Sequence, residues 1–135
     1  MAVILIVDDD PVVREIATEM LRADDHAILE ASDGDKALRV LKAVAVDVVV
    51  LDMLMPNKDG LEAIMEIRRA RSKVRILAIS SGGSINLGDL LKTATIFGAD
   101  AVMQKPLRVG PFAQKIAELV AFAAPSDDMF GDTAA

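Results

Sequence analysis

The stretch that decides the fold reads Asp47-Val48-Val49-Val50-Leu51-Asp52-Met53-Leu54-Met55-Pro56-Asn57-Lys58-Asp59-Gly60. An apolar, β-branched run ends in a carboxylate, and a proline and an Asp-Gly pair follow shortly after it. Apolar runs without polar alternation are typical of strands that are covered on both faces, as in a parallel sheet. We therefore expect a strand over residues 47–52, with Asp52 at its carboxyl end, where open α/β sheets bind ligands.

The composition is that of an ordinary globular domain. The chain has 135 residues, of which 53% are hydrophobic and 27% charged, and this length suits one domain. It contains no cysteine, which excludes disulfides and thiolate metal sites. The net charge of −6 argues against a surface for nucleic acid. No basic segment precedes the apolar N-terminus and acidic residues follow it, so we expect neither a signal peptide nor a membrane span.

The rest of the chain alternates short apolar runs with segments of helical periodicity. The runs predict four further strands, at residues 2–7, 27–31, 74–79 and 101–104. Apolar residues at helical spacing predict helices at residues 11–23, from Asp33-Gly34 onward, and at 60–71, 87–97 and 111–123. Five strand–helix repeats indicate one α/β domain over residues 1–124, with a doubly wound parallel sheet. Residues 125–135 are polar and small, and we expect a flexible tail there.

Three adjacent carboxylates end the first predicted strand. Asp10 precedes Pro11 and fits a helix N-cap followed by proline at the first helical position. Asp8 and Asp9 have no such structural role. Because adjacent carboxylates repel one another, two of them at a strand end require a compensating cation.

In the strand order 2-1-3-4-5 of the flavodoxin-like class, the first and third strands would be neighbours. Asp8, Asp9 and Asp52 would then converge. Ser80 and Lys105 end the next two strands. Three carboxylates in one crevice suit a hard divalent cation, most simply Mg²⁺, which also favours phosphate oxygens. The hydroxyl and the ammonium offer the donor and the second positive charge that a phosphoryl group requires, so the residues indicate phosphoryl chemistry.

In these positions the chain resembles the receiver domains of two-component response regulators, over roughly Val3 to Ala123. The motifs that carry the resemblance occur in order and on the expected elements. They are Val7-Asp8-Asp9-Asp10-Pro11 with Arg14, Leu51-Asp52-Met53-Leu54-Met55-Pro56 with Asp59-Gly60, Ser80, Gly98-Ala99-Asp100-Ala101 and Lys105-Pro106. The resemblance implies a single-domain receiver with a chemotaxis-regulator-like fold.

The resemblance also implies a phosphoryl acceptor and a metal site. Asp52 would accept the phosphoryl group from a histidine kinase or a histidine phosphotransfer protein. Asp9, Asp52 and the backbone carbonyl of Leu54 would bind Mg²⁺, with Asp8 acting through water. Such a domain catalyses only its own phosphorylation and slow autodephosphorylation, and it switches the binding of a downstream protein. It would be cytoplasmic and a monomer or weak dimer, with no direct contact to nucleic acid and no membrane insertion.

By the same resemblance, Ser80 and Lys105 would contact the phosphoryl oxygens, and the Lys105-Pro106 peptide bond would be cis, an isomer that X-Pro bonds adopt at little cost. Two features depart from the family pattern. Val102 stands where the family often has an aromatic side chain, so a switch based on an aromatic rotamer lacks its residue. Residues 82–88 form a glycine-rich, slightly long loop that we expect to be mobile.

We expect the kinase-side partner to dock on an apolar rim around the acidic crevice. Three strand-end loops place apolar residues beside the charged residues, namely Pro11, Val12, Met55, Pro56 and Leu107. A histidine donor has to be brought within bonding reach of Asp52, and a dry rim would exclude competing water.

Three other functions remain open at this point. A haloacid-dehalogenase-like phosphatase would use Asp8 as nucleophile and Asp10 as acid, but the chain has no room for a cap domain and Asp52 would have no role. A flavodoxin-like nucleotide or flavin binder is disfavoured because no glycine-rich loop follows the first strand and three acids would repel a phosphate. The same fold could also serve as an interaction module that is never phosphorylated.

Overall fold

The computed structural model describes residues 1–55, 59–70, 72–81 and 87–130, without the side chains of residues 87, 90, 91 and 123–130. Pro56 of the predicted docking rim lies outside the described residues. Residues 82–86 of the predicted mobile loop do so as well, and the last two residues of that loop belong to a helix.

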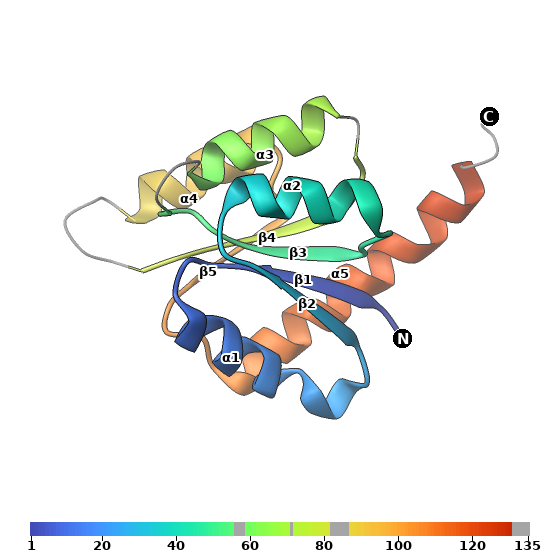
Figure 1. The fold of residues 1–135 in the computed structure, drawn as a ribbon, viewed down its shortest axis with the longest axis horizontal. Coiled ribbons are helices and arrows are strands. Elements are labelled where there is room, and N and C mark those ends of the chain that lie inside the picture. The colour runs from blue at the N-terminus through green and yellow to red at the C-terminus, as the bar shows by residue number, and fades with distance from the viewer. Residues whose placement is uncertain (56–58, 71, 82–86, 131–135) are drawn as a thin grey trace.

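Five parallel strands form one sheet in the order β2-β1-β3-β4-β5 (Figure 1). This order confirms the predicted doubly wound, flavodoxin-like sheet. The strands are β1 (Val3–Val7), β2 (Ala27–Ala31), β3 (Val48–Asp52), β4 (Arg75–Ser80) and β5 (Ala101–Gln104).

Helices cover both faces of the sheet (Figure 1). One face packs against α2, α3 and α4, and the other packs against α1 and α5. The helices are α1 (Pro11–Met20), a short 3-10 helix (Arg22–Asp24), α2 (Gly34–Ala43), α3 (Gly60–Arg69), α4 (Leu87–Phe97) and α5 (Val109–Phe130). In the described part of the chain, none of them is both long and apolar enough to cross a membrane.

The central strand β3 is buried along its whole length. Because successive strand residues point to opposite faces, Val49 and Leu51 enter the core beneath α2, α3 and α4. Val48 and Val50 enter the core beneath α1 and α5. The apolar run without polar alternation is thus explained by a strand that supplies two cores at once.

Aspartates begin three of the helices. The side chains of Asp10, Asp33 and Asp59 each accept a hydrogen bond from a backbone amide in the first turn of α1, α2 and α3, respectively. Such N-caps satisfy amides that have no partner inside the helix. The predicted cap at Asp10 is confirmed.

Helix α5 differs from its predicted range at both ends. It begins at Val109 rather than at Pro111. Proline is tolerated there because the first amides of a helix have no intrahelical partner. The helix also continues past Ala123 to Phe130, so the first part of the predicted tail is helical. Two alanines precede Pro125 and favour helix, whereas the proline itself removes one backbone hydrogen bond.

Two other helices end earlier than predicted. Helix α1 stops at Met20, before the 3-10 turn, and α3 stops at Arg69 rather than at Arg71. In α3, Met65 lies at the sequence spacing of core residues, but it is 39% exposed. The buried residues of α3 are instead Gly60, Ala63, Ile64 and Ile67, whose spacing places Met65 at the edge of the buried stripe.

Candidate functional site

Three carboxylates meet at the carboxyl edge of the sheet. Asp52 is the last residue of β3, and Asp8 and Asp9 follow β1. Val7 pairs with Leu51 across the two strands, which brings the next residue on each strand to the same place. Oxygens of the three carboxylates lie within 4.8 Å of one another, a spacing that could hold a metal ion. Asp8 and Asp52 are buried, whereas Asp9 is exposed.

Hydrogen bonds fix the position of Asp8. Its amide donates to the carbonyl of Ala31 at 3.1 Å, and one carboxylate oxygen accepts from the amide of Asp10 at 2.9 Å. Arg14 donates to the backbone carbonyl of Asp8 at 2.7 Å and is itself held by Glu30 at 2.8 Å. The carboxylate of Asp8 is therefore held in place, with one oxygen left for a cation.

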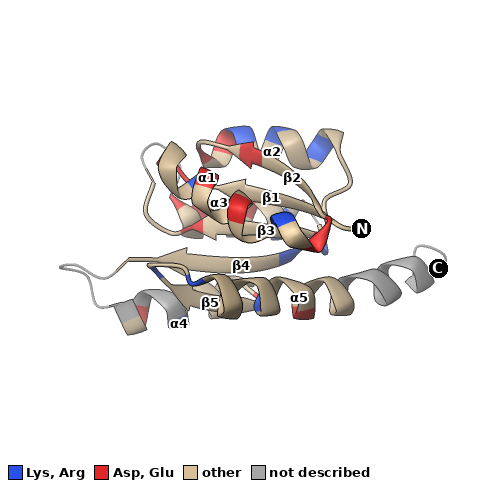
Figure 2. Ribbon diagram, turned by 90° about the horizontal axis from the view of Figure 1, so that it is seen from below, with Lys and Arg blue, Asp and Glu red and all other residues tan. Residues whose placement is uncertain are grey.

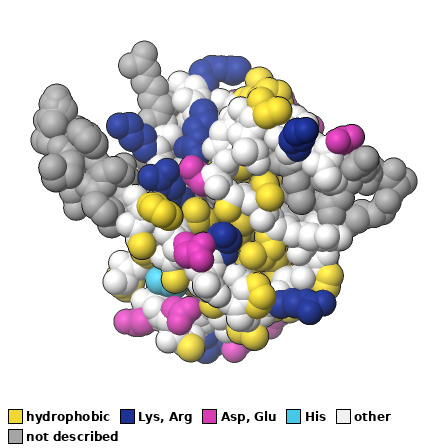
Figure 3. All heavy atoms as spheres, turned by 180° about the vertical axis from the view of Figure 1, so that it is seen from behind, with side chains coloured by type: hydrophobic (Ala, Val, Ile, Leu, Met, Phe, Trp, Pro, Cys, Tyr) yellow, Lys and Arg dark blue, Asp and Glu magenta, His cyan; other side chains and the backbone are white. Residues whose placement is uncertain are grey.

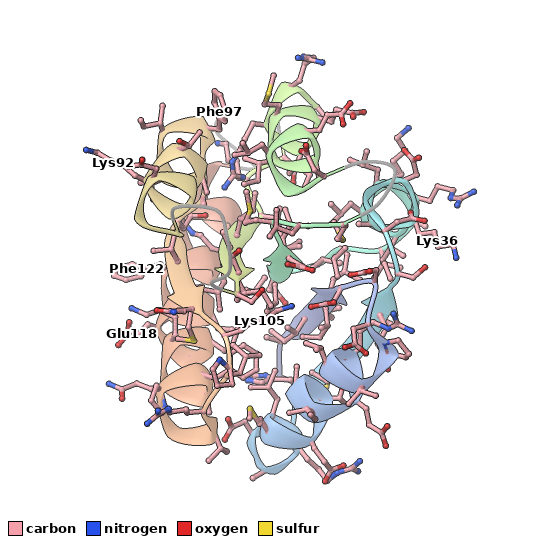
Figure 4. All side chains as sticks on the ribbon, turned by 90° about the vertical axis from the view of Figure 1, so that its left-hand side faces the viewer. Lys36, Lys92, Phe97, Lys105, Glu118 and Phe122 are labelled. Atoms are coloured by element: carbon pink, nitrogen blue, oxygen red, sulfur yellow. The ribbon has the colours of Figure 1, made fainter. Side chains whose placement is uncertain are left out.

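Lys105 brings an ammonium group into the crevice from β5. Its Nζ lies 2.8 Å from Oδ2 of Asp8 and 3.6 Å from Oδ2 of Asp52. Figure 4 views the molecule from the carboxyl ends of the strands and shows Lys105 among them. The Lys105–Pro106 peptide bond is cis, as expected from the family resemblance. The amide of Lys105 donates to the carbonyl of Ser80 at 2.8 Å.

Asp52 stands in an environment that disfavours its charge. Burial, followed by the nearby charge of Asp8, raises its pKa from 3.8 to about 6. A hydrogen bond from the amide of Leu54 at 3.2 Å and the charge of Lys105 act in the opposite direction but do not cancel the rise. Burial alone would lower the pKa of Lys105, but its hydrogen bond to Asp8 and the carboxylate charges outweigh burial, and the pKa is raised. The crevice therefore favours the binding of a further cation.

Gly60 allows the start of α3 to lie against the end of β3. A Cβ atom at this position would lie 2.5 Å from Cα of Met53 and 2.8 Å from the carbonyl oxygen of Asp52. Any larger residue would push the helix away from the strand end. The Asp-Gly pair noted in the sequence thus supplies both a helix cap and a close approach beside Asp52.

Ser80 is fully buried at the end of β4, the strand next to β3. Its hydroxyl donates to the carbonyl of Ser81 at 3.3 Å. The side chain is therefore close to the crevice but engaged with its own loop, and its contact with a phosphoryl group stays a prediction.

The predicted docking rim is only partly on the surface. Pro11 and Val12 are exposed and Leu107 is half-buried. Met55 was wrongly assigned to the rim, because its side chain is only 9% exposed and packs in the core beneath α2, α3 and α4. The strand ends at Asp52, and the chain then turns Met53 and Met55 back into that core.

A hollow of about 320 Å³ lies beside the rim and was not predicted. Four apolar residues line it, namely Val13, Ile16, Pro106 and Leu107, together with Ser81 and Lys105. Ile16 falls on the helical spacing of core residues, yet its side chain is 46% exposed. The spacing in α1 therefore gave no signal that this residue lines a surface hollow.

Comparisons with known proteins agree with this geometry. Residues 4–117 match the family model of the response regulator receiver domain. The chain is 33% identical to response regulator MprA of Mycolicibacterium vanbaalenii, over 98% of this chain and 55% of that protein. It is 31% identical to the chemotaxis protein CheY of Halobacterium salinarum, over 78% of this chain and 85% of that protein.

A solved structure gives the same result. The receiver domain of NtrX from Brucella abortus superimposes with a TM-score of 0.80 at 25% identity, over 87% of this chain and 98% of that one. The chain spans about half the length of several curated relatives that it matches, MprA among them.

Proposed function

This chain belongs to the response regulator receiver domain family of two-component signalling, and we propose that Asp52 is its phosphoryl acceptor. The observation that carries the proposal is the convergence of Asp8, Asp9 and Asp52 on one crevice with Lys105 at 3.6 Å from Asp52. In the transfer, a carboxylate oxygen of Asp52 would bond to phosphorus as the bond from phosphorus to the donor's histidine nitrogen breaks.

The acidic residues fit a magnesium ion. Asp9 and Asp52 would hold it through carboxylate oxygens together with the backbone carbonyl of Leu54, and Asp8 would act through water. Carboxylate and carbonyl oxygens are the ligands that Mg²⁺ prefers. When bound, the ion would neutralise the negative charge that accumulates between carboxylate and phosphoryl oxygens.

Lys105 and Ser80 would complete the site. Lys105 already carries its charge close to Asp52 and would shift from Asp8 toward a phosphoryl oxygen. The hydroxyl of Ser80 would exchange its weak bond to the Ser81 carbonyl for one to another phosphoryl oxygen. Both side chains would then contact phosphoryl oxygens that are present only after the transfer. Phosphorylation of Asp52 would in this way change the positions of neighbouring side chains.

The donor would be a histidine kinase or a histidine phosphotransfer protein. Pro11, Val12 and the hollow beside them offer an apolar surface next to the crevice. Exposed apolar surface rimmed by polar groups is typical of protein interaction sites. Docking there would bring a phosphohistidine to Asp52 and keep bulk water away.

Mass spectrometry after incubation with acetyl phosphate and Mg²⁺ tests the assignment. The wild-type chain should gain one phosphoryl group on Asp52, and Asp52→Asn should gain none. Labelling that survives in Asp52→Asn and disappears in Asp8→Asn would establish the phosphatase-like alternative instead. Because the donor is a small molecule, this experiment does not depend on the docking surface.

A further inference from the structure

Four cations form a surface on the side of the molecule that α2 and α3 cover. Lys36, Arg39 and Lys42 lie on α2 at intervals of three residues, and Arg69 ends α3. All four are exposed, and the interval places the α2 residues on the side of the helix away from the core. We call this set the basic α2–α3 surface. Figure 2 shows its basic bands along α2.

These cations lack the carboxylate partners that other cations of the chain have. Arg14, Arg22, Arg75 and Lys115, for example, each lie within 3.3 Å of a carboxylate oxygen. In contrast, the side chains of Arg39, Lys42 and Arg69 form no ion pair or hydrogen bond within the part of the chain that the structure describes. Lys36 donates only to the hydroxyl of Ser32, at 2.9 Å.

The basic α2–α3 surface occurs in a chain that is acidic overall. The chain carries 21 acidic and 15 basic residues, so an unpaired basic surface is not a consequence of composition. On the opposite side of the molecule from the one that faces the viewer in Figure 1, Lys and Arg side chains lie among Asp and Glu side chains (Figure 3).

Helix stability accounts for only part of the pattern. Lys42 and Arg69 lie in the last turns of their helices, where the helix dipole favours cations. Lys36 lies in the first turn of α2, where the dipole disfavours a cation, and Arg39 lies in the middle. The helix dipole therefore accounts for only two of the four cations.

A groove of about 290 Å³ runs between the two helices inside this surface. Leu38, Lys42, Glu66, Arg69 and Ala70 line it. Leu38 and Ala70 give it apolar walls, and Lys42 and Arg69 place positive charge on its rim. Glu66, also in its lining, has an interaction of its own. The groove thus combines a site for one aliphatic side chain with surrounding positive charge.

We propose that the basic α2–α3 surface binds an acidic segment of a partner protein, whose carboxylates face the four cations while one aliphatic side chain enters the groove. An acidic peptide uses both features. A nucleic acid would use only the charge, and the net charge of −6 would repel it. The surface also lies apart from the acidic crevice, since Lys36 points outward on one side of the molecule while Lys105 lies among the strand ends (Figure 4). Binding here is therefore compatible with phosphorylation at Asp52.

A titration followed by nuclear magnetic resonance tests the proposal directly. The probe is a helical peptide with glutamates along one face and a single exposed leucine, and the control peptide has glutamine at each glutamate position. The acidic peptide should shift the amide signals of residues 36–42 and 66–70, and the control peptide should not. Because both peptides carry the leucine, the difference isolates the contribution of charge.

Two matched double variants locate the effect. Arg39→Glu with Lys42→Glu should weaken binding of the acidic peptide at least tenfold. Lys92→Glu with Arg108→Glu removes the same charge from other exposed positions and should weaken it less than threefold. Asp52→Asn should bind as the wild type does, which separates this surface from the proposed phosphoryl site.

Several results would overturn the proposal. These are signal shifts centred on α4 or α5, equal losses in the two double variants, and no binding of the acidic peptide at millimolar concentration. Duplex DNA that binds this surface as tightly as the peptide does at physiological salt would make it a general polyanion site and would also refute the proposal.

Discussion

Arg68 donates two hydrogen bonds to the backbone carbonyl of Gly98, from Nε at 3.2 Å and from Nη2 at 2.8 Å. The same guanidinium donates to the carbonyls of Ser72 and Val74 at 2.9 and 2.7 Å and pairs with Asp100 at 3.0 Å. At Gly98 the chain has φ +128°, and a Cβ atom there would lie 3.0 Å from Cγ of Arg68. One side chain thus ties the end of α4 to the end of α3 and to the segment before β4.

Gly98→Ala should destabilise the protein by about 1–3 kcal/mol, because an alanine at this φ is strained and its methyl group would crowd Arg68. Gly110→Ala is the matched control, since a Cβ atom there meets nothing within 4 Å and alanine favours helix. Urea unfolding followed by far-ultraviolet circular dichroism measures both, because the chain has no tryptophan or tyrosine for fluorescence. An equal effect of the two substitutions would contradict the role of the Arg68 contact.

Asp52→Asn should be more stable than the wild type at pH 7 to 8 in buffer without divalent cations. The pKa of Asp52 is about 6 in the folded protein against 3.8 ordinarily, so the folded protein binds the carboxyl proton of Asp52 more tightly than the unfolded chain does. The stability that this proton contributes is complete below about pH 4 and is lost as the pH rises through about 6. We expect a gain of about 1–2 kcal/mol above pH 7, after allowance for solvent screening, and almost none near pH 4.

Two controls accompany the Asp52 measurement. Glu15→Gln, at an exposed carboxylate, should change the free energy of unfolding by less than about 0.5 kcal/mol at any pH. Addition of Mg²⁺ should stabilise the wild type and not Asp52→Asn, because only the wild type keeps the carboxylate of residue 52 that would bind the ion. A wild type that is more stable than Asp52→Asn without metal would show that Lys105 fully compensates the buried charge.

Asp9→Ala should weaken Mg²⁺ binding by about tenfold or more, because it removes a carboxylate ligand. Isothermal titration calorimetry measures the affinity. Asp10 is a suitable comparison: its carboxylate caps α1, so Asp10→Asn should leave the affinity within about threefold of the wild type. Unchanged affinity in Asp9→Ala would place the ion elsewhere.

The phosphoryl group should be long-lived, since hydrolysis requires a polar group that holds a water molecule near Asp52. Leu54, two residues beyond Asp52, is 40% exposed and cannot orient water. The corresponding position beyond Ser80 is Gly82, which lies outside the described residues and has no side chain. Leu54→Asn should raise the decay rate of the phosphorylated form about tenfold, less than a full general base contributes.

Leu54→Ala distinguishes the two possible causes of such a change. It removes the apolar cover without adding an amide, so the decay rate should stay within about twofold of the wild type if water positioning is decisive. Equal acceleration by alanine and asparagine would mean that Leu54 acts by shielding, and a wild-type half-life of seconds would refute the prediction outright.

Val12→Lys and Ile16→Lys should each slow phosphoryl transfer from a phosphorylated histidine partner about tenfold, which corresponds to about 1.4 kcal/mol of lost interaction. Labelling by acetyl phosphate should be unchanged, because that donor needs no docking surface. Ile96→Lys is the control, with a side chain that is 73% exposed on α4. Equal slowing with both donors would indicate that the substitution disturbed the crevice itself.

The sequence predicted the sheet and the charged crevice for one physical reason. The carboxyl ends of parallel strands share an edge, so residues that end β1, β3, β4 and β5 are brought together by topology alone. Side-chain detail could not be predicted in the same way. The spacing of Ile16 fits the core as well as it fits the hollow, and nothing local indicated that Met55 turns inward or that Arg68 contacts Gly98.

The ion pair between Lys105 and Asp8 has a consequence for which cations the crevice accepts. With all three carboxylates ionised, one ammonium group leaves two negative charges uncompensated. A divalent cation balances that charge, whereas a monovalent cation leaves one negative charge of the crevice without a counterion. Charge balance would therefore favour divalent over monovalent cations, whatever the size and coordination number of the ion. Lys105 would supply one positive charge permanently, and the bound ion would supply the other two.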